Sequence, residues 1–258
     1  MSLRTLQILN VLGFGLVILL NTLANSLPLN GYTTGQLSDR YPNLFVPSGF
    51  TFSIWGIIYL LLLVFLIYQI RNWWSKHRLD MSFINRIGPW FFISCLANAS
   101  WIIAWHYLLP GLSLLIMLMI LGSLIIIYLR LGIGDPEAAP ANFWAVKLPF
   151  SVYLGWITVA TIANVTTVLV DLGWRGGSIP ESVWTVVMIS IAAVIGLIVL
   201  YRRGDIAYVA VLVWAFFGIY SKRQALNDES SIAQTAIIGM IVLAIGAAIS
   251  VLRKRRTN

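Results

Sequence analysis

Residues 49–70 read GFTFSIWGIIYLLLLVFLIYQI, a run in which no side chain carries a charge. An α-helix rises about 1.5 Å per residue, so a run of this length can cross the roughly 30 Å hydrocarbon core of a bilayer. Comparable apolar runs recur along the chain, and every acidic residue falls between them. The sequence therefore predicts eight spans, at residues 6–26, 49–70, 87–109, 111–131, 145–170, 182–201, 206–221 and 232–252.

The overall composition supports this interpretation. Of the 258 residues, 59% are hydrophobic and 10% are charged, whereas about 25% of the residues in an ordinary soluble domain are charged. A soluble helical protein would carry charges along its exposed helix faces, but here the charges separate the apolar runs. We therefore expect an all-α polytopic transmembrane helix bundle whose main partner is the lipid bilayer.

The basic residues are distributed unequally between alternate loops. Thirteen of the 17 fall on one side, among them Arg4 and the C-terminal group at residues 253–256. The four on the other side are Arg40, Arg175, Lys222 and Arg223. Because basic loops are retained on the cytoplasmic side of a membrane, we expect both termini to be cytoplasmic. This sorting also accounts for the net charge of +8 without a nucleic-acid partner.

The first predicted span has some features of a secretory signal peptide. Arg4 precedes it, and Ala24-Asn25-Ser26 resembles a cleavage site. Its apolar stretch, however, is longer than the core of a typical signal peptide and contains Asn10 and Asn21. We expect the span to be retained; its removal would leave seven spans.

The longest connection between predicted spans is at residues 27–48, and the distribution of basic residues places it outside the cell. A long loop among short ones often acts as a lid over a binding site. An ordinary solvated loop is the alternative.

The eleven tryptophans form two groups. Six lie near predicted helix ends, where an interfacial aromatic belt accounts for them: Trp73, Trp74, Trp90, Trp144, Trp174 and Trp184. The belt accounts less well for the five that lie deeper: Trp55, Trp101, Trp105, Trp156 and Trp214.

Three of the predicted spans carry an aromatic or amide face. Residues three, four, seven or eight positions apart share one face of a helix, which groups Trp55 with Tyr59, Asn98 with Trp101 and Trp105, and Trp156 with Ala160 and Asn164. At about 1.5 Å per residue, these faces fall in the outer half of the bilayer. Because an amide is costly against lipid, we expect the two asparagines either to line a cavity or to join helices by hydrogen bonds.

The same residues lie in three motifs. The stretch 47–59 ends in Trp-Gly-Ile-Ile-Tyr, residues 98–101 read Asn-Ala-Ser-Trp, and residues 153–156 read Tyr-Leu-Gly-Trp. In this order they resemble the second, third and fifth helices of the TspO/MBR family, which comprises tryptophan-rich sensory proteins and mitochondrial translocator (peripheral benzodiazepine receptor) proteins. The resemblance covers about residues 1–170. We therefore divide the chain into a five-helix core at 1–172 and three additional helices with a basic tail at 173–258.

The resemblance implies a ligand site inside the five-helix core, closed by the first external loop. It implies planar hydrophobic ligands such as porphyrins, haem-pathway intermediates and sterols, and a bound porphyrin or haem rather than a covalent cofactor. The ligand-binding residues that it predicts are Trp55, Tyr59, Asn98, Trp101, Trp156, Ala160 and Asn164. A multi-pass location in the bacterial plasma membrane and a homodimer are further expectations.

We expect a membrane receptor or carrier for a planar hydrophobic ligand, with a tetrapyrrole such as a porphyrin as one candidate. A secondary transporter of a small hydrophobic solute is the alternative. No predicted span carries an acidic residue near its centre, which ion coupling usually requires, and no inverted repeat is evident.

An enzyme is a third class of function, and we do not expect it. The sequence contains no nucleophile–base pair, metal-binding motif or phosphate loop, and only the resemblance suggests a porphyrin-degrading activity. His106 is expected to be structural, with contact to a porphyrin edge or metal as the alternative. Cys95, the only cysteine, is expected to be a small buried residue.

Overall fold

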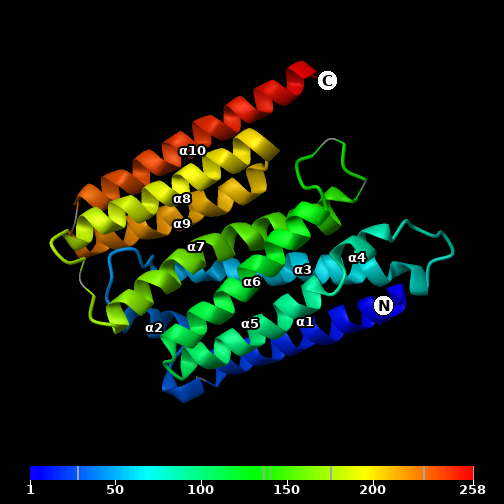
Figure 1. Cartoon of the computed structure of the whole chain (residues 1–258), viewed down its shortest axis with the longest axis horizontal. Helices are drawn as coiled ribbons and strands as arrows, with labels where there is room; N and C mark the ends of the chain where they lie inside the picture. Colours follow the sequence, from blue (N-terminus) through cyan, green and yellow to red (C-terminus); the bar gives the residue numbers. More distant parts are fainter. Residues whose placement is uncertain (28, 136, 140, 175, 229, 258) are drawn as a thin grey trace. The chain divides into compact units, whose positions relative to one another are not determined.

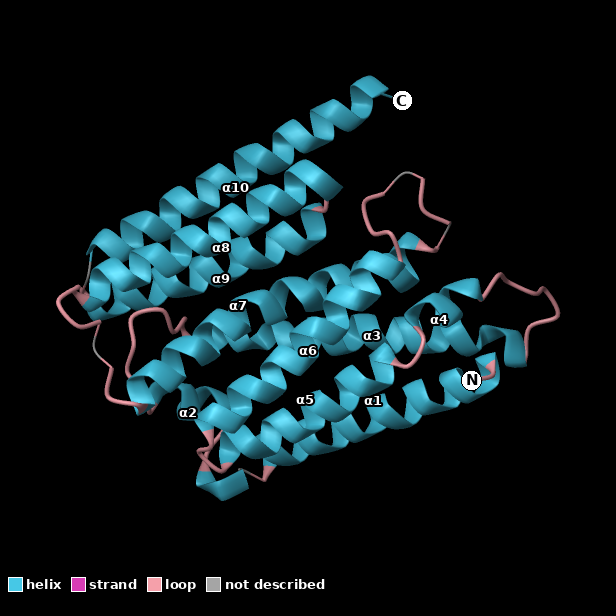
Figure 2. Ribbon diagram, viewed as in Figure 1, coloured by secondary structure: helices cyan, strands magenta, loops and turns pink. Residues whose placement is uncertain are grey.

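The computed structural model describes residues 1–27, 29–135, 137–139, 141–174, 176–228 and 230–257. In that part of the chain the secondary structure is helical, with no strand (Figures 1 and 2). Arg175 and Glu229, which the sequence analysis assigned to loops, lie outside the described residues. So do the side chains of residues 254–256, which carry most of the basic tail.

Eight long helices lie where the sequence predicts eight spans, which confirms the fold class. They are α1 (Leu3–Ser26), α3 (Ile54–Ile70), α5 (Trp90–His106), α6 (Pro110–Arg130), α7 (Leu148–Asp171), α8 (Glu181–Arg203), α9 (Ile206–Leu226) and α10 (Ser230–Thr257). The shorter helical segments are α2 (Thr34–Asp39), α4 (Ser82–Ile87), Leu29–Gly31, Gly49–Ser53, Arg71–Trp73 and Phe143–Lys147.

Seven of the long helices, some with an adjoining turn, are long and apolar enough to cross a membrane. These segments are 3–26, 49–73, 110–130, 143–171, 181–203, 206–226 and 231–253. The remaining long helix, α5, has 17 residues. They cover about 25 Å, which is the lower limit for a membrane span. The protein is an integral, multi-pass membrane protein.

The predicted spans and the helices differ in their bounds by a few residues, and two of these differences have a clear cause in the backbone. The span predicted at 87–109 is interrupted near its start, because α4 ends at Ile87 and Gly88 has a positive φ of 59°. The backbone turns again at Leu108, with a φ of 57°. A left-handed residue ends a helix, so the apolar composition alone overestimated the length of α5.

The helix α9 is longer than the predicted span at 206–221, because it continues to Leu226. Lys222 and Arg223 therefore lie in its last turns, although the sequence analysis placed them in a loop. Asn227, with a φ of 51°, ends the helix in the left-handed conformation. Basic side chains are favourable at this end of a helix.

The chain forms two compact units, of which unit 1 comprises residues 1–34 and 54–154. In it α1 packs against α3, α4 and α5, and α5 packs against α6. The rings of Phe65, Phe91 and Phe150 meet edge to face, at centroid distances of 5.0, 5.2 and 5.7 Å. These three rings form the centre of an apolar core.

Buried amides join α1 to α3 in unit 1. The Asn10 amide donates to Gln69 Oε1 at 2.9 Å, and Trp73 Nε1 donates to Gln7 Oε1 at 2.9 Å. Polar side chains between membrane helices are expected to bond to one another, because lipid offers them no partner.

Unit 2 comprises residues 35–53 and 155–258. In it α8, α9 and α10 lie side by side (Figure 1). The segment before α3 packs on α9, where the Ser48 amide donates to the Gly218 carbonyl at 3.0 Å and Trp214 Nε1 donates to the Thr51 carbonyl at 3.0 Å. Gly218 permits this approach, since a Cβ there would collide with the Thr51 side chain.

The C-terminal part of α7 also belongs to unit 2. A Cβ on Gly155 would lie 2.8 Å from the Tyr208 carbonyl oxygen, so the glycine allows α7 to approach α9. The Tyr208 hydroxyl donates to Thr158 Oγ1 at 2.9 Å. The two units thus divide the chain between residues 154 and 155, inside α7. The predicted domain boundary at 172/173 lies elsewhere along the chain, and it stays a prediction.

Candidate ligand-binding sites

Four of the predicted ligand-binding residues meet in unit 1. The Trp55 and Tyr59 rings of α3 stack at 5.4 Å, with an interplanar angle of 28°. The Trp55 ring also lies 6.5 Å from the ring of Trp101 on α5. The spacing along each helix therefore predicted correctly that these aromatic residues share a face.

The stack continues along α5 toward the connection between α1 and α3. Trp101 and Trp105 stack at 5.6 Å, with 17° between their planes, and both are buried. Trp105 Nε1 donates to the carbonyl of Thr34 at 3.2 Å. We use the name aromatic cluster for Trp55, Tyr59, Trp101, Trp105 and Tyr153, whose ring lies 6.0 Å from that of Trp55.

Asn98 joins three helices beside the aromatic cluster. Its amide nitrogen donates to the Tyr153 hydroxyl of α7 at 3.0 Å, and its amide oxygen accepts from Asn21 Nδ2 of α1 at 3.1 Å. The side chain is 1% exposed. Of the two roles that the sequence left open for this residue, the structure shows the interhelical hydrogen bonds.

The Tyr59 hydroxyl is a polar group inside the aromatic cluster. It is buried beside the Asn98 side chain, and no hydrogen bond to it has normal geometry among the described residues. The Tyr59 ring also lies edge to face with Phe14 of α1, at 6.3 Å. A buried hydroxyl without a partner is costly, and a ligand with a polar edge would satisfy it.

The other three predicted residues lie on the part of α7 that belongs to unit 2. Trp156 is buried and meets the Phe52 ring edge to face at 6.0 Å. Asn164 is also buried, and its amide donates to the carbonyl of Ala160, one turn earlier. The convergence of these three residues with the aromatic cluster stays a prediction.

His106 lies at the end of α5, in unit 1. Its side chain is fully buried, and Nδ1 lies 2.7 Å from the Ile102 carbonyl oxygen. Nε2 has no partner among the described residues. Cys95, one turn before Asn98, is buried and free.

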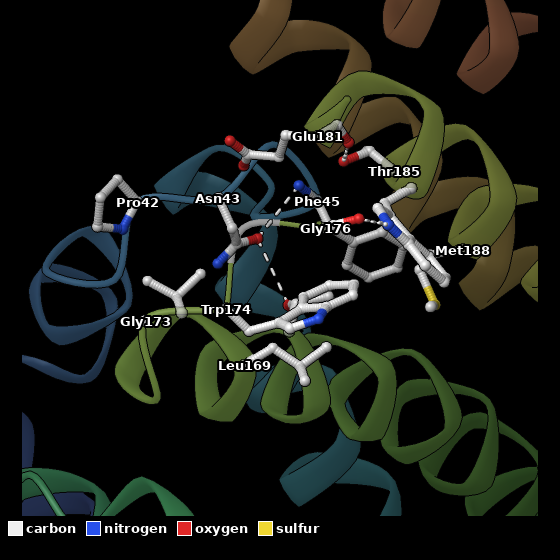
Figure 3. A pocket seen from close by; sticks show the side chains of 13 residues that line it. Pro42, Asn43, Phe45, Leu169, Gly173, Trp174, Gly176, Glu181, Thr185 and Met188 are labelled. Carbon is white, nitrogen blue, oxygen red and sulfur yellow. Dashed lines mark hydrogen bonds between the residues drawn. The ribbon is translucent and has the colours of Figure 1, made fainter. Parts of the chain in front are cut away.

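Unit 2 contains a cavity of about 370 Å³ that the sequence analysis missed (Figure 3). It lies between the end of α7, the start of α8 and the loop before Gly49. We call it the indole cavity. Its described lining residues are Pro42, Asn43, Phe45, Thr166, Leu169, Val170, Gly173, Trp174, Gly176, Glu181, Trp184, Thr185 and Met188.

Two tryptophans that the sequence analysis assigned to the membrane interface line this cavity. The rings of Trp174 and Trp184 meet at 5.0 Å with 64° between their planes, and Trp184 Nε1 donates to the Gly176 carbonyl at 3.4 Å. A Cβ on Gly176 would lie 2.8 Å from the Trp184 ring, so this position requires glycine. Gly173 and Gly176, which lie close to Trp174 on either side in the sequence, were the one local signal that this tryptophan does more than anchor a helix end.

Hydrogen bonds hold the loop that forms the opposite wall of the indole cavity. Asn43 Oδ1 accepts from the amides of Phe45 and Val46, each at 3.2 Å. Glu181 Oε1 accepts from the Leu44 amide at 3.1 Å. Figure 3 shows the Glu181 carboxylate on the same side of the cavity as Asn43.

A second cavity, of about 350 Å³, adjoins the first through Pro42, Asn43 and Glu181, which line both. Its walls carry two ion pairs, Lys222 with Asp39 at 2.7 Å and Arg223 with Asp228 at 3.1 Å. Tyr41 also lines it. Burial raises the pKa of Tyr41, the nearby Asp171 carboxylate raises it further, and Arg40 acts in the opposite direction.

Comparison with known proteins agrees with the motifs. A family model described as TSPO-like protein matches residues 7–249. The match extends far beyond residue 170, so it includes α8, α9 and most of α10, and it corrects the expectation that the resemblance ends with the five-helix core. No curated protein and no solved structure matches the chain.

Proposed function

The chain belongs to the TSPO-like family, and from this premise we propose that it binds a planar hydrophobic ligand at the aromatic cluster of unit 1. Family membership makes it a membrane sensory or translocator-like protein. The observation that carries the proposal is the stack of Trp55, Tyr59 and Trp101 between α3 and α5.

The chemistry of the aromatic cluster favours a flat ligand with a polar edge. Indole and phenol rings present broad apolar faces, and aromatic pairs gain energy beyond the area they bury. The Tyr59 hydroxyl offers a buried hydrogen-bonding group with no partner at normal geometry among the described residues. A porphyrin or another tetrapyrrole combines a planar apolar ring with polar substituents, so it fits these residues better than a sterol does.

Haem is a specific member of this ligand class. A bound haem would supply an iron atom that takes an imidazole nitrogen as a ligand. His106 Nε2 is a buried nitrogen without a partner among the described residues, so unit 1 contains a residue of the required chemistry. The proposal concerns binding and includes no catalytic step.

Titration of the purified protein in lipid nanodiscs with protoporphyrin IX tests this function. We expect saturable quenching of tryptophan fluorescence together with a shift of the porphyrin absorption band. Trp55→Phe should weaken binding about tenfold, because it removes the larger of two stacked rings. Trp144→Phe is the matched control, since Trp144 is 71% exposed and the ring contact described for it is with Phe143, outside the aromatic cluster.

Two results would contradict the proposal. One is the absence of saturable binding for protoporphyrin IX, haem and cholesterol alike. The other is equal weakening by Trp55→Phe and Trp144→Phe, which would indicate a general effect of the bilayer interface. Gradient-driven uptake of the bound compound into sealed vesicles would favour the transporter instead of a receptor.

A further inference from the structure

We propose that the indole cavity of unit 2 is a second ligand site and that it takes a lipophilic organic cation, such as an aromatic amine or an aryl quaternary ammonium ion. The site shares no residue with the aromatic cluster. It therefore goes beyond the proposed function, and either one can be correct without the other.

The size and the walls of the cavity suit a small aromatic body. A volume of about 370 Å³ lies within the range of ligand pockets, roughly 300–1,000 Å³. Leu169, Val170, Phe45 and Met188 supply apolar surface. A thioether adapts its shape to the ligand more easily than a branched side chain does.

The two indole rings favour a cation in particular. An indole face attracts a positive charge through its negative quadrupole, and tryptophan does so more strongly than the other aromatic residues. Trp174 and Trp184 both line the cavity, and their ring planes stand at 64° to each other. The N–H of Trp184 is used by the Gly176 carbonyl, which leaves its ring face as the group that a ligand would meet.

The charge of the lining has the matching sign. Glu181 is the one charged side chain among the described lining residues. Its carboxylate accepts one backbone hydrogen bond, from Leu44, whereas a carboxylate has about four acceptor positions. It therefore retains capacity to bind an ammonium group.

The two basic residues that line the adjoining cavity are paired with other carboxylates. Lys222 and Arg223, in the adjoining cavity, pair with Asp39 and Asp228. Arg175 follows Trp174 in the sequence and lies outside the described residues. The variant Arg175→Gln therefore tests the effect of its charge.

Three probes with one ring system and different charges distinguish the classes of ligand. They are (1-naphthylmethyl)trimethylammonium, 1-naphthalenemethanol and 1-naphthaleneacetate. Their binding to the full chain in nanodiscs is measured by equilibrium dialysis, with empty nanodiscs subtracting partition into lipid. We expect saturable binding of the cation with a dissociation constant at least tenfold below that of the alcohol, and no saturable binding of the anion.

Variants assign the binding to the cavity. Glu181→Gln keeps an oxygen that accepts from the Leu44 amide but removes the charge. It should therefore weaken binding of the cation about tenfold and leave binding of the alcohol unchanged. Trp184→Leu should weaken both. Asp80→Asn is the matched control for loss of one acidic charge, and Arg175→Gln should bind the cation at least as tightly as the unmodified chain.

The proposal is overturned if the three probes bind equally, or if Glu181→Gln and Asp80→Asn have the same effect on the cation. Preferential binding of the anion, lost in Arg175→Gln, would also overturn it and assign the site to acidic ligands. Trp55→Phe should leave cation binding unchanged. A wrong proposal for the cation site can therefore be distinguished from a wrong proposal for the porphyrin site.

Discussion

The aromatic cluster of unit 1 and the indole cavity of unit 2 use the same residue types in opposite ways. In the cluster the rings contact one another, and Trp101 is 6% exposed. In the cavity two indoles border an open volume, and Trp174 is 39% exposed. The difference teaches that a tryptophan-rich membrane protein can combine a packed aromatic core with a separate, preformed space. The packed core contributes to stability through its ring contacts, whereas the cavity leaves a volume that a small ligand could fill without displacing those contacts.

Removing one indole ring from each region tests most directly whether the two regions differ in packing. Trp101→Ala deletes a buried ring from a packed stack and should lower the free energy of unfolding by about 3–5 kcal/mol. Trp174→Ala deletes a partly exposed ring at the rim of a cavity and should cost about 1 kcal/mol or less. Thermal unfolding in detergent, monitored by near-ultraviolet circular dichroism, measures both. Equal losses would mean that the two regions are packed alike.

The amide that joins the helices of unit 1 gives the next largest effect. Asn98→Ala leaves the Tyr153 hydroxyl and the Asn21 amide without their shared partner. Its cost should be about 1–2 kcal/mol, since interhelical hydrogen bonds in membranes are worth about that much or less. Asn25→Ala is the control, because the Asn25 amide is exposed and donates to the Asn21 carbonyl of its own helix. An equal or larger loss for Asn25→Ala would show that the interhelical bonds of Asn98 add little to stability.

Much of the fold could be predicted from the sequence, because a membrane span is a local property of about 20 apolar residues. The facing of Trp55 with Tyr59 was equally predictable, since helical spacing fixes it. The interruption at Gly88 was missed because apolar composition does not show where the backbone adopts a positive φ. Helix ends therefore remained the weakest part of the prediction.

The indole cavity could not be predicted, and the reason is physical. Its walls bring Asn43 and Leu44 next to Glu181, which is 137 positions from Leu44 along the chain. Such a contact depends on how distant elements pack, and one sequence carries no local signal for it. The tryptophans of the cavity lie near helix ends, where the interfacial belt is a sufficient explanation. Only the packed arrangement distinguishes a belt residue from a cavity wall.

A smaller effect on stability is expected from removing the Tyr59 hydroxyl of the aromatic cluster. Tyr59→Phe removes a buried hydroxyl that has no partner among the described residues, so the free energy of unfolding should change by less than about 0.5 kcal/mol or rise slightly. Protoporphyrin binding should nevertheless weaken a few-fold if the hydroxyl bonds to the ligand. A marked loss of stability, measured as for Trp101→Ala, would instead show that the hydroxyl has a structural partner. Unchanged binding would remove Tyr59 from the site.

The smallest expected effect concerns the loop that walls the indole cavity. Asp39 pairs with Lys222 of α9, but its side chain is 63% exposed, and exposed ion pairs contribute about 0–1 kcal/mol. Asp39→Asn should therefore change the thermal midpoint little and weaken the naphthyl cation by no more than about threefold, because salt screens the exposed pair. The difference between Asp39→Asn and the unmodified chain should disappear at 1 M salt. If the difference in cation binding persists at 1 M salt, the ion pair positions residues 42–45 directly. The indole cavity would then depend strongly on its loop, unlike the aromatic cluster, whose rings are held by several contacts.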